Sequence, residues 1–287
     1  MMRILDASQQ IPALFSTAGF AYDKWEVYIH SVFPGCTHIF TDEVKQYLES
    51  GQYTFEKDFL PILNAVPQNP GLPILQANFA AVTEDLDQRV SACFGRTLDV
   101  DIVLYLGLCC AAGWVTRVNG RDAILLGVEK ILELGWQGLD DMYGLLYHEL
   151  GHVYQAQYGV LERESADSAK NFVWQLFTEG IAMYFEQTLV GDAAYYHQDK
   201  DGWLPWCDEH FRQLLADFNQ DLPSMTQFTQ RYFGDWCSYH GRGDTGYYLG
   251  ARFVRYLTET RPFDSLLDLE IQPVFELYKE FVRRYSL

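Results

Sequence analysis

The sequence predicts an α+β protein that is mostly helical and contains one small mixed sheet. Apolar residues recur at three- and four-residue spacings through residues 1–94 and again after Gly138, as in amphipathic helices. Between them, short runs rich in branched residues are typical of strands. The chain has 287 residues, 48% of them hydrophobic, which suffices for one large domain or two lobes. We assign a helical N-terminal lobe to residues 1–95 and the sheet with a second helical lobe to residues 96–287.

The first lobe is expected to contain four helices, at residues 21–32, 42–50, 56–66 and 75–94. Pro34-Gly35 ends the first helix, and the Pro-containing segment 67–73 separates the third from the fourth.

Two strands are expected at residues 101–106 and 123–128. Asn119-Gly120 lies between them and is a turn pair that joins neighbouring strands. We expect strand 123–128 to be an edge strand, which an extended peptide could join by backbone hydrogen bonds.

Helical signals return at residues 139–158, with acidic residues in the first turn and Gly159 beyond the end. Further helices are expected at residues 169–190 and 247–258. The aromatic and acidic stretch between those two is expected to be rich in loops.

Charge and composition exclude some partners and locations. The net charge of −18, from 21 basic and 39 acidic residues, repels nucleic acid. No apolar run is long enough to span a membrane, and the first residues lack the apolar stretch of a secretory signal. We therefore expect a cytoplasmic protein without membrane contact, whose six cysteines are reduced thiols. No pattern predicts a particular oligomeric state.

The most informative segment is His148-Glu149-Leu150-Gly151-His152, inside the helix expected at 139–158. Histidines four residues apart share one helix face, so both can bind one metal ion with the glutamate beside a metal-bound water. A zinc ion activates that water, and Glu149 is expected to move its proton as general base and acid. The alternative is that these residues lie on the solvated face of an amphipathic helix.

A catalytic zinc site needs a third protein ligand from another element. Glu179 is the best candidate, because Gly180 and Ala182 beside it would let its helix approach the histidine helix closely. Glu186, two turns later on the same helix face, is the chief competitor for this role.

With these residues the chain resembles the gluzincin clan of zinc metallopeptidases, the thermolysin-like group. The pairing with Glu179-Gly180-Ile181-Ala182 is similar to the Glu-Gly-x-Ala form of collagenase-like and predicted zinc-dependent proteases. The resemblance covers about residues 120–260 and implies a zincin-like region with one Zn²⁺ per chain. Thermolysin has an Asp four residues after the ligand Glu, where this chain has Met183. The Gly-x-Met-Glu-Asn box of aminopeptidases is also absent.

The segment from Tyr247 to Val254 is similar to the Tyr-x-x-Gly-x-x-Phe-Val helix of such proteins. By that resemblance Tyr247 would donate its hydroxyl to the oxyanion at the scissile carbonyl. Tyr248 and His240 are alternative donors, and each tyrosine could instead be a packing residue.

Two Cys-x-x-His pairs, Cys207 with His210 and Cys237 with His240, could form a structural zinc site. Buried thiols beside polar histidines are the simpler interpretation. Arg242 could bind a substrate carboxylate or lie on the surface.

These observations favour a zinc metallopeptidase that cleaves an extended peptide. One rival is a peptide-binding or regulatory protein on a peptidase-like scaffold. The other is a zinc hydrolase of a non-peptide amide, because the same water attack serves any such carbonyl.

Overall fold

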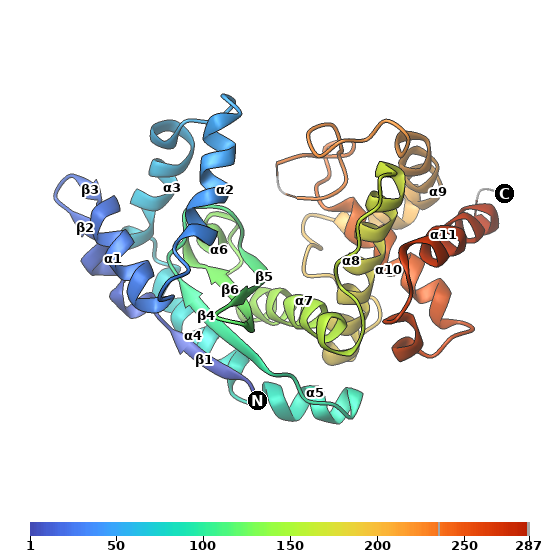
Figure 1. Ribbon diagram of the computed structural model, residues 1–287, viewed down its shortest axis with the longest axis horizontal. Helices are drawn as coiled ribbons and strands as arrows, with labels where there is room; N and C mark the ends of the chain where they lie inside the picture. The colour runs from blue at the N-terminus through green and yellow to red at the C-terminus, as the bar shows by residue number, and fades with distance from the viewer. Residues whose placement is uncertain (235, 286–287) are drawn as a thin grey trace. The chain divides into compact units, whose positions relative to one another are not determined.

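The computed structural model, which describes residues 1–234 and 236–285, confirms an α+β fold with a small mixed sheet (Figure 1). The chain divides into two units, Met1–Glu149 and Leu150–Leu287. The division falls inside helix α7 (Leu139–Tyr158), so this helix is shared by both units. The first unit contains the sheet, and the second consists of helices and loops.

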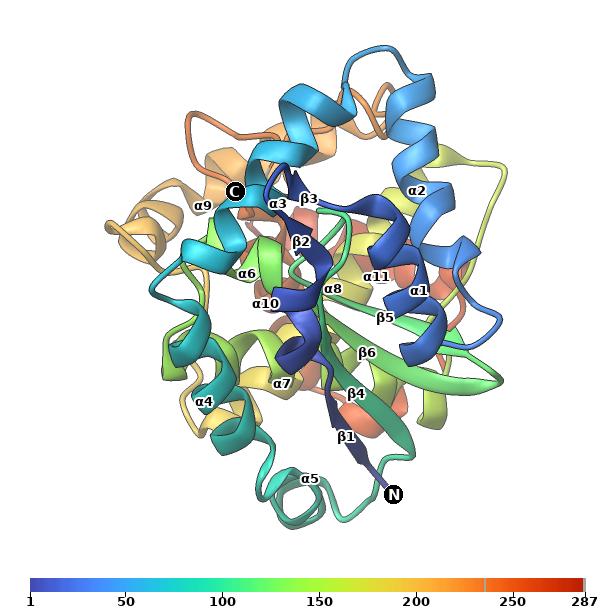
Figure 2. The same ribbon diagram turned by 90° about the vertical axis from the view of Figure 1, so that its left-hand side faces the viewer.

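The sheet has four strands in the order β1-β4-β6-β5 (Figure 2). β1 (Arg3–Asp6) and β6 (Arg121–Gly127) both pair in parallel with β4 (Val100–Tyr105). β5 (Gly113–Val118) pairs antiparallel with β6. The side chains of β4 and β6 are almost all buried, which explains their continuous apolar sequences.

The expectation that residues 123–128 form an edge strand is wrong. β6 lies inside the sheet, with β4 on one side and β5 on the other. The Asn119-Gly120 pair does form a two-residue turn, with φ of 50° and 81°, but it joins β6 to β5. The outer strands are therefore β1 and β5, and neither was predicted from the sequence.

The first unit contains the four predicted helices with shifted bounds, the last of them divided in two, and a short helix after β6 that was not predicted. They are α1 (Tyr22–Val32), α2 (His38–Glu49), α3 (Leu60–Ala65), α4 (Leu72–Thr83), α5 (Leu86–Phe94) and α6 (Val128–Glu133). A π-helical turn (Phe55–Phe59) precedes α3, and a 3₁₀ segment (Ser8–Leu14) follows β1. A short hairpin of β2 (Phe15–Ser16) and β3 (Gly19–Phe20) comes next. The helix expected at residues 75–94 is interrupted after Thr83 and resumes at Leu86.

In the second unit the second half of α7 is followed by four separate helices, α8 (Ser168–Val190), α9 (Trp203–Asp221), α10 (Thr245–Thr258) and α11 (Ile271–Tyr285). α7, α8 and α10 agree with the predicted helices to within two residues. The expectation of loops between α8 and α10 is wrong for the nineteen residues of α9. α11 was not predicted.

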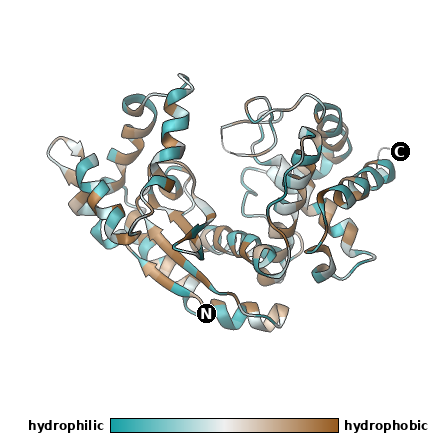
Figure 3. Ribbon diagram, in the orientation of Figure 1, coloured by the Kyte–Doolittle hydropathy of each residue, from teal (hydrophilic) through white to brown (hydrophobic). Residues whose placement is uncertain are grey.

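Hydropathy shows where each unit has its core. In Figure 3 the strands β4 and β6 are mostly hydrophobic, whereas α9 and α11 alternate between hydrophobic and hydrophilic residues. The apolar residues of α9 and α11, such as Phe211, Phe218 and Phe281, are buried. Within the described residues, no helix combines the length and apolar character needed to cross a membrane.

Candidate metal centre

Helix α7 carries the two histidines and the glutamate of the motif near its middle. Leu146, Leu150 and Val153 are completely buried, so packing fixes the rotation of the helix about its axis. His148 is 4% exposed and Glu149 is 6% exposed. The alternative, a solvated helix face, is therefore wrong for these two residues.

A close backbone contact sets the spacing between α7 and α8. A Cβ atom added to Gly151 would lie 2.6 Å from Cα of Ala182, so only glycine fits there. The prediction that Ala182 allows the close approach is confirmed. For Gly180 it is wrong, because a Cβ atom there would instead lie 2.2 Å from the Gly250 carbonyl oxygen of α10.

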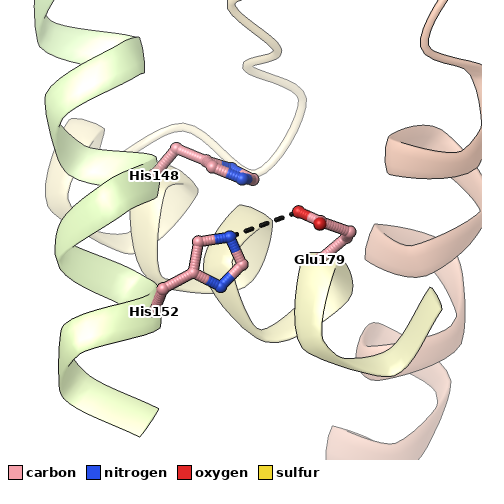
Figure 4. A group of neighbouring side chains, drawn as sticks. All are labelled: His148, His152 and Glu179. Carbon is pink, nitrogen blue, oxygen red and sulfur yellow. Dashed lines mark ion pairs between the residues drawn. The ribbon is translucent and has the colours of Figure 1, made fainter. Parts of the chain in front are cut away.

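This crossing brings the three predicted ligands together. Glu179 lies three residues before Ala182, and His148 and His152 lie on either side of Gly151. Nε2 of His152 is 3.3 Å from Oε2 of Glu179. The three side chains each offer a ligand atom within 4.8 Å of the others, and Figure 4 shows them turned toward one another.

The donor set fits zinc. Two imidazole nitrogens and one carboxylate oxygen are the three protein ligands of one class of catalytic zinc site. Ligand atoms about 2 Å from a tetrahedral ion lie roughly 3.3 Å apart, which is the separation found between His152 and Glu179. Their side chains are 14% and 15% exposed, so the site is partly accessible to solvent.

Glu149 lies against the outer strand of the sheet. A Cβ atom added to Gly113, the first residue of β5, would be 3.0 Å from Oε1 of Glu149 and 2.9 Å from Leu145. The absence of a side chain at Gly113 therefore leaves room for the carboxylate. Both residues belong to the first unit, so this contact places the predicted general base beside β5.

A second group with metal-like spacing shares His148 and consists of His148, Glu186 and His197, all buried. Nδ1 of His197 is 3.0 and 3.1 Å from the two carboxylate oxygens of Glu186. Nε2 of His197 is 2.9 Å from the side-chain nitrogen of Gln198. Glu186 is thus close to the site, as the competitor role implies. His197 carries no sequence signal because it follows the end of α8 at no characteristic spacing.

The predicted oxyanion donors have different surroundings. The Tyr248 hydroxyl donates a hydrogen bond to Asp208 at 2.7 Å, and burial raises the pKa of this tyrosine. Tyr248 is therefore a packing residue. Tyr247 is partly exposed and lies three residues before Gly250, which packs on α8. His240 is exposed in a turn, with its ring against Tyr239.

The Cys-x-x-His pairs are held by other contacts. Burial raises the pKa of Cys207 to about 12, and His210 stacks on Trp206. In the described part of the chain, neither pair belongs to a group with metal-ligand spacing. Arg242 donates a hydrogen bond to the Asp201 carbonyl oxygen.

A comparison with protein-family models found no match, and comparisons with curated proteins and with solved structures found none either. Only the geometry of the candidate site therefore supports a functional assignment.

Proposed function

We propose that this protein is a cytoplasmic, zinc-dependent metallopeptidase of the gluzincin kind. One observation carries the proposal: His148, His152 and Glu179 offer three ligand atoms within 4.8 Å, and the buried Glu149 occupies the position between the histidines. Histidines and a carboxylate from two crossing helices, with a further carboxylate beside them, are the parts that metal-assisted amide hydrolysis needs.

Each residue has a separate role in this proposal. Zinc, when bound to His148, His152 and Glu179, supplies Lewis acidity toward the carbonyl oxygen and the attacking water. Glu149 accepts the proton of that water and passes it to the leaving nitrogen. Tyr247 or His240 donates a hydrogen bond to the carbonyl oxygen as negative charge develops there.

The peptide substrate is proposed to pair with β5. Among the residues that the structure describes, this strand has a neighbour in the sheet on one side only, so its other side offers backbone donors and acceptors to an extended chain. Glu149 touches the first residue of β5, which brings the proton acceptor close to a peptide in that position.

The position of Glu149 argues against the two rival functions to different degrees. A purely binding or regulatory protein has no catalytic use for a carboxylate between the two histidines that would bind the metal. A hydrolase of a non-peptide amide would need the same residues. Only the outer strand β5 argues against that rival, because such a strand can pair with an extended peptide backbone.

Metal analysis and a peptide library test the proposal. We expect about one zinc per chain in the wild type, loss of zinc in His148→Ala and weaker binding in Glu179→Gln. Glu149→Gln should keep its zinc and cleave peptides about 100- to 10,000-fold more slowly. A wild type that takes up no zinc after dialysis against it would refute the proposal. Zinc binding without any turnover would favour the binding protein, and turnover of small amides alone would favour the other hydrolase.

A further inference from the structure

We propose that Glu129 is a positioning residue, which holds the connection between β4 and β5 and thereby sets the start of β5 for the peptide substrate. This inference rests on the proposed function, in which the peptide pairs with β5. It assigns a role to a buried carboxylate of the first unit that the proposed zinc site does not use.

The connection between β4 and β5 has to cross the end of another strand. β5 follows β4 in the sequence but lies beyond β6 in the sheet (Figure 2). Tyr105, the last residue of β4, is paired with Gly127, the last residue of β6, so residues 106–112 pass the end of β6. Glu129 is the second residue of α6, which begins directly after β6. Its side chain is therefore in place to bind the crossing backbone.

Glu129 binds this connection through two backbone N–H groups. The N–H of Gly107 donates to Oε2 at 2.9 Å, and the N–H of Cys109 donates to Oε1 at 3.0 Å. Glu129 is 1% exposed, so these bonds replace the water that the carboxylate has lost. Cys109 has a φ of 65°, a left-handed conformation that residues with a side chain rarely adopt. Such a conformation persists only where its surroundings hold it, and the bond to Glu129 does so here.

Two glycines leave room for the carboxylate and for the crossing backbone. A Cβ atom added to Gly107 would lie 2.6 Å from Oε1 of Glu129, and one added to Gly127 would lie 2.5 Å from the Ala111 carbonyl oxygen. The N–H of Gly127 also donates to the carbonyl oxygen of Ala112 at 2.9 Å. The connection is therefore seated directly on the end of β6, one residue before β5 begins.

The end of this connection determines which backbone groups β5 presents. Ala112 is hydrogen-bonded to Gly127, and residue pairs in an antiparallel ladder alternate between bonded and non-bonded. The N–H and C=O groups of Gly113 and Val115 therefore point away from β6, toward the side where the peptide is proposed to pair. Gly113 also leaves room for Glu149. A shift of the connection would move these backbone groups relative to the proposed general base.

The variant Glu129→Gln tests this role. The amide nitrogen that replaces one carboxylate oxygen cannot accept a hydrogen bond, so one of the two N–H groups loses its acceptor. We expect KM for an extended peptide to rise about 10-fold, while kcat and zinc affinity stay within about twofold of the wild type. Hydrogen exchange should become about 10-fold faster at residues 107–115 and should not change in α7 and α8.

Glu133→Gln is the matched control, because it makes the same change at an exposed residue of the same helix. It should leave KM, kcat, zinc affinity and hydrogen exchange within about twofold of the wild type. If Glu129→Gln does not fold, Gly107→Ala takes its place, since the added Cβ atom would push against the same carboxylate oxygen. The same rise in KM and the same local change in exchange are expected for it.

Two outcomes would overturn the inference while the proposed function survives. One is wild-type KM and wild-type hydrogen exchange in Glu129→Gln. The other is faster exchange throughout both units with an unchanged KM, which would mean that Glu129 contributes to stability only. A wild type that binds no zinc or cleaves no peptide would instead refute the proposed function itself. Local exchange in Glu129→Gln would then still decide whether the carboxylate holds the connection.

Discussion

Two regions of the molecule place functional backbone by different means. In the first unit, the loop at residues 106–112 leads from β4 into β5 and is held by buried polar side chains. The carbonyl oxygen of Leu106 accepts a hydrogen bond from Nε1 of Trp25, and the backbone N–H of Leu106 donates one to the Tyr28 hydroxyl. Two further loop N–H groups donate to Glu129 at 2.9 and 3.0 Å.

In the second unit, α7 and α8 meet through direct contact of their backbones at Gly151 and Ala182. The helices satisfy their own backbone groups, so no polar side chain is needed at the crossing. In this protein, hydrogen bonds from side chains thus position the irregular loop, whereas the absence of a side chain at Gly151 positions the two regular helices. Loss of one hydrogen bond should destabilise the loop locally, whereas one added methyl group should displace a whole helix.

The largest effect is expected for Gly151→Ala. The new Cβ atom would meet Cα of Ala182 at 2.6 Å, so overpacking should lower the free energy of unfolding by about 1–3 kcal/mol. Zinc affinity should fall as well, because the helix crossing aligns His152 with Glu179. Denaturant titration and chelator competition measure the two effects.

Ala156→Gly is the matched control for that variant, since Ala156 is exposed on the same helix. It should lower stability by about 1 kcal/mol through helix propensity alone and leave zinc affinity unchanged. Equal losses of zinc affinity in both variants would mean that stability, not the crossing, controls metal binding.

A smaller effect is expected for Tyr28→Phe, which removes one of the side-chain hydrogen bonds that hold the loop at residues 106–112. The buried N–H of Leu106 loses its acceptor, which lowers the free energy of unfolding by about 1–2 kcal/mol. Zinc affinity should not change. Tyr22→Phe on the same helix is the control, because Tyr22 is 41% exposed and should change stability by less than about 0.5 kcal/mol. An effect on zinc in Tyr28→Phe would show that the loop and the metal site are coupled.

The smallest effect concerns pH. Burial raises the pKa of Glu129 in the folded protein, partly offset by the N–H groups of Gly107 and Cys109. The folded state thus binds this proton more tightly than the unfolded chain does. The resulting stabilisation is present at low pH and is lost as pH rises through the folded-state pKa. Relative to Glu129→Gln, which cannot ionise, the wild type should lose stability as pH rises above the ordinary pKa of a glutamate and through the raised pKa of Glu129. Parallel pH profiles of urea unfolding for the two proteins would contradict this.

The parts of the fold that sequence could predict are those with strong local signals. α7 and α8 have long periodic patterns, and Asn119-Gly120 is a turn pair with its own backbone preference. β1 has only four residues and exists through pairing with β4, which no local pattern encodes. α9 was missed because its aromatic and acidic residues resemble a loop, although Phe211 and Phe218 are buried together with Cys207.

The same distinction applies to the candidate site. The motif residues His148, Glu149 and His152 could be predicted because they share about one helical turn. Glu179 could be predicted because small residues lie beside it. The helix that Gly180 contacts depends on the tertiary arrangement, as does the place of residues 123–128 inside the sheet. His197 was missed because its contact with Glu186 depends on the path of the chain after α8.

The parallel pairing of β1 with β4 has a consequence for the order of folding. Ile4 is paired with Ile102, a separation of 98 residues, whereas the β5–β6 hairpin closes over two. Closing the longer loop costs more chain entropy and postpones the contact. During synthesis on the ribosome, the first strand therefore waits for α1–α5 and β4 to emerge before its place in the sheet exists.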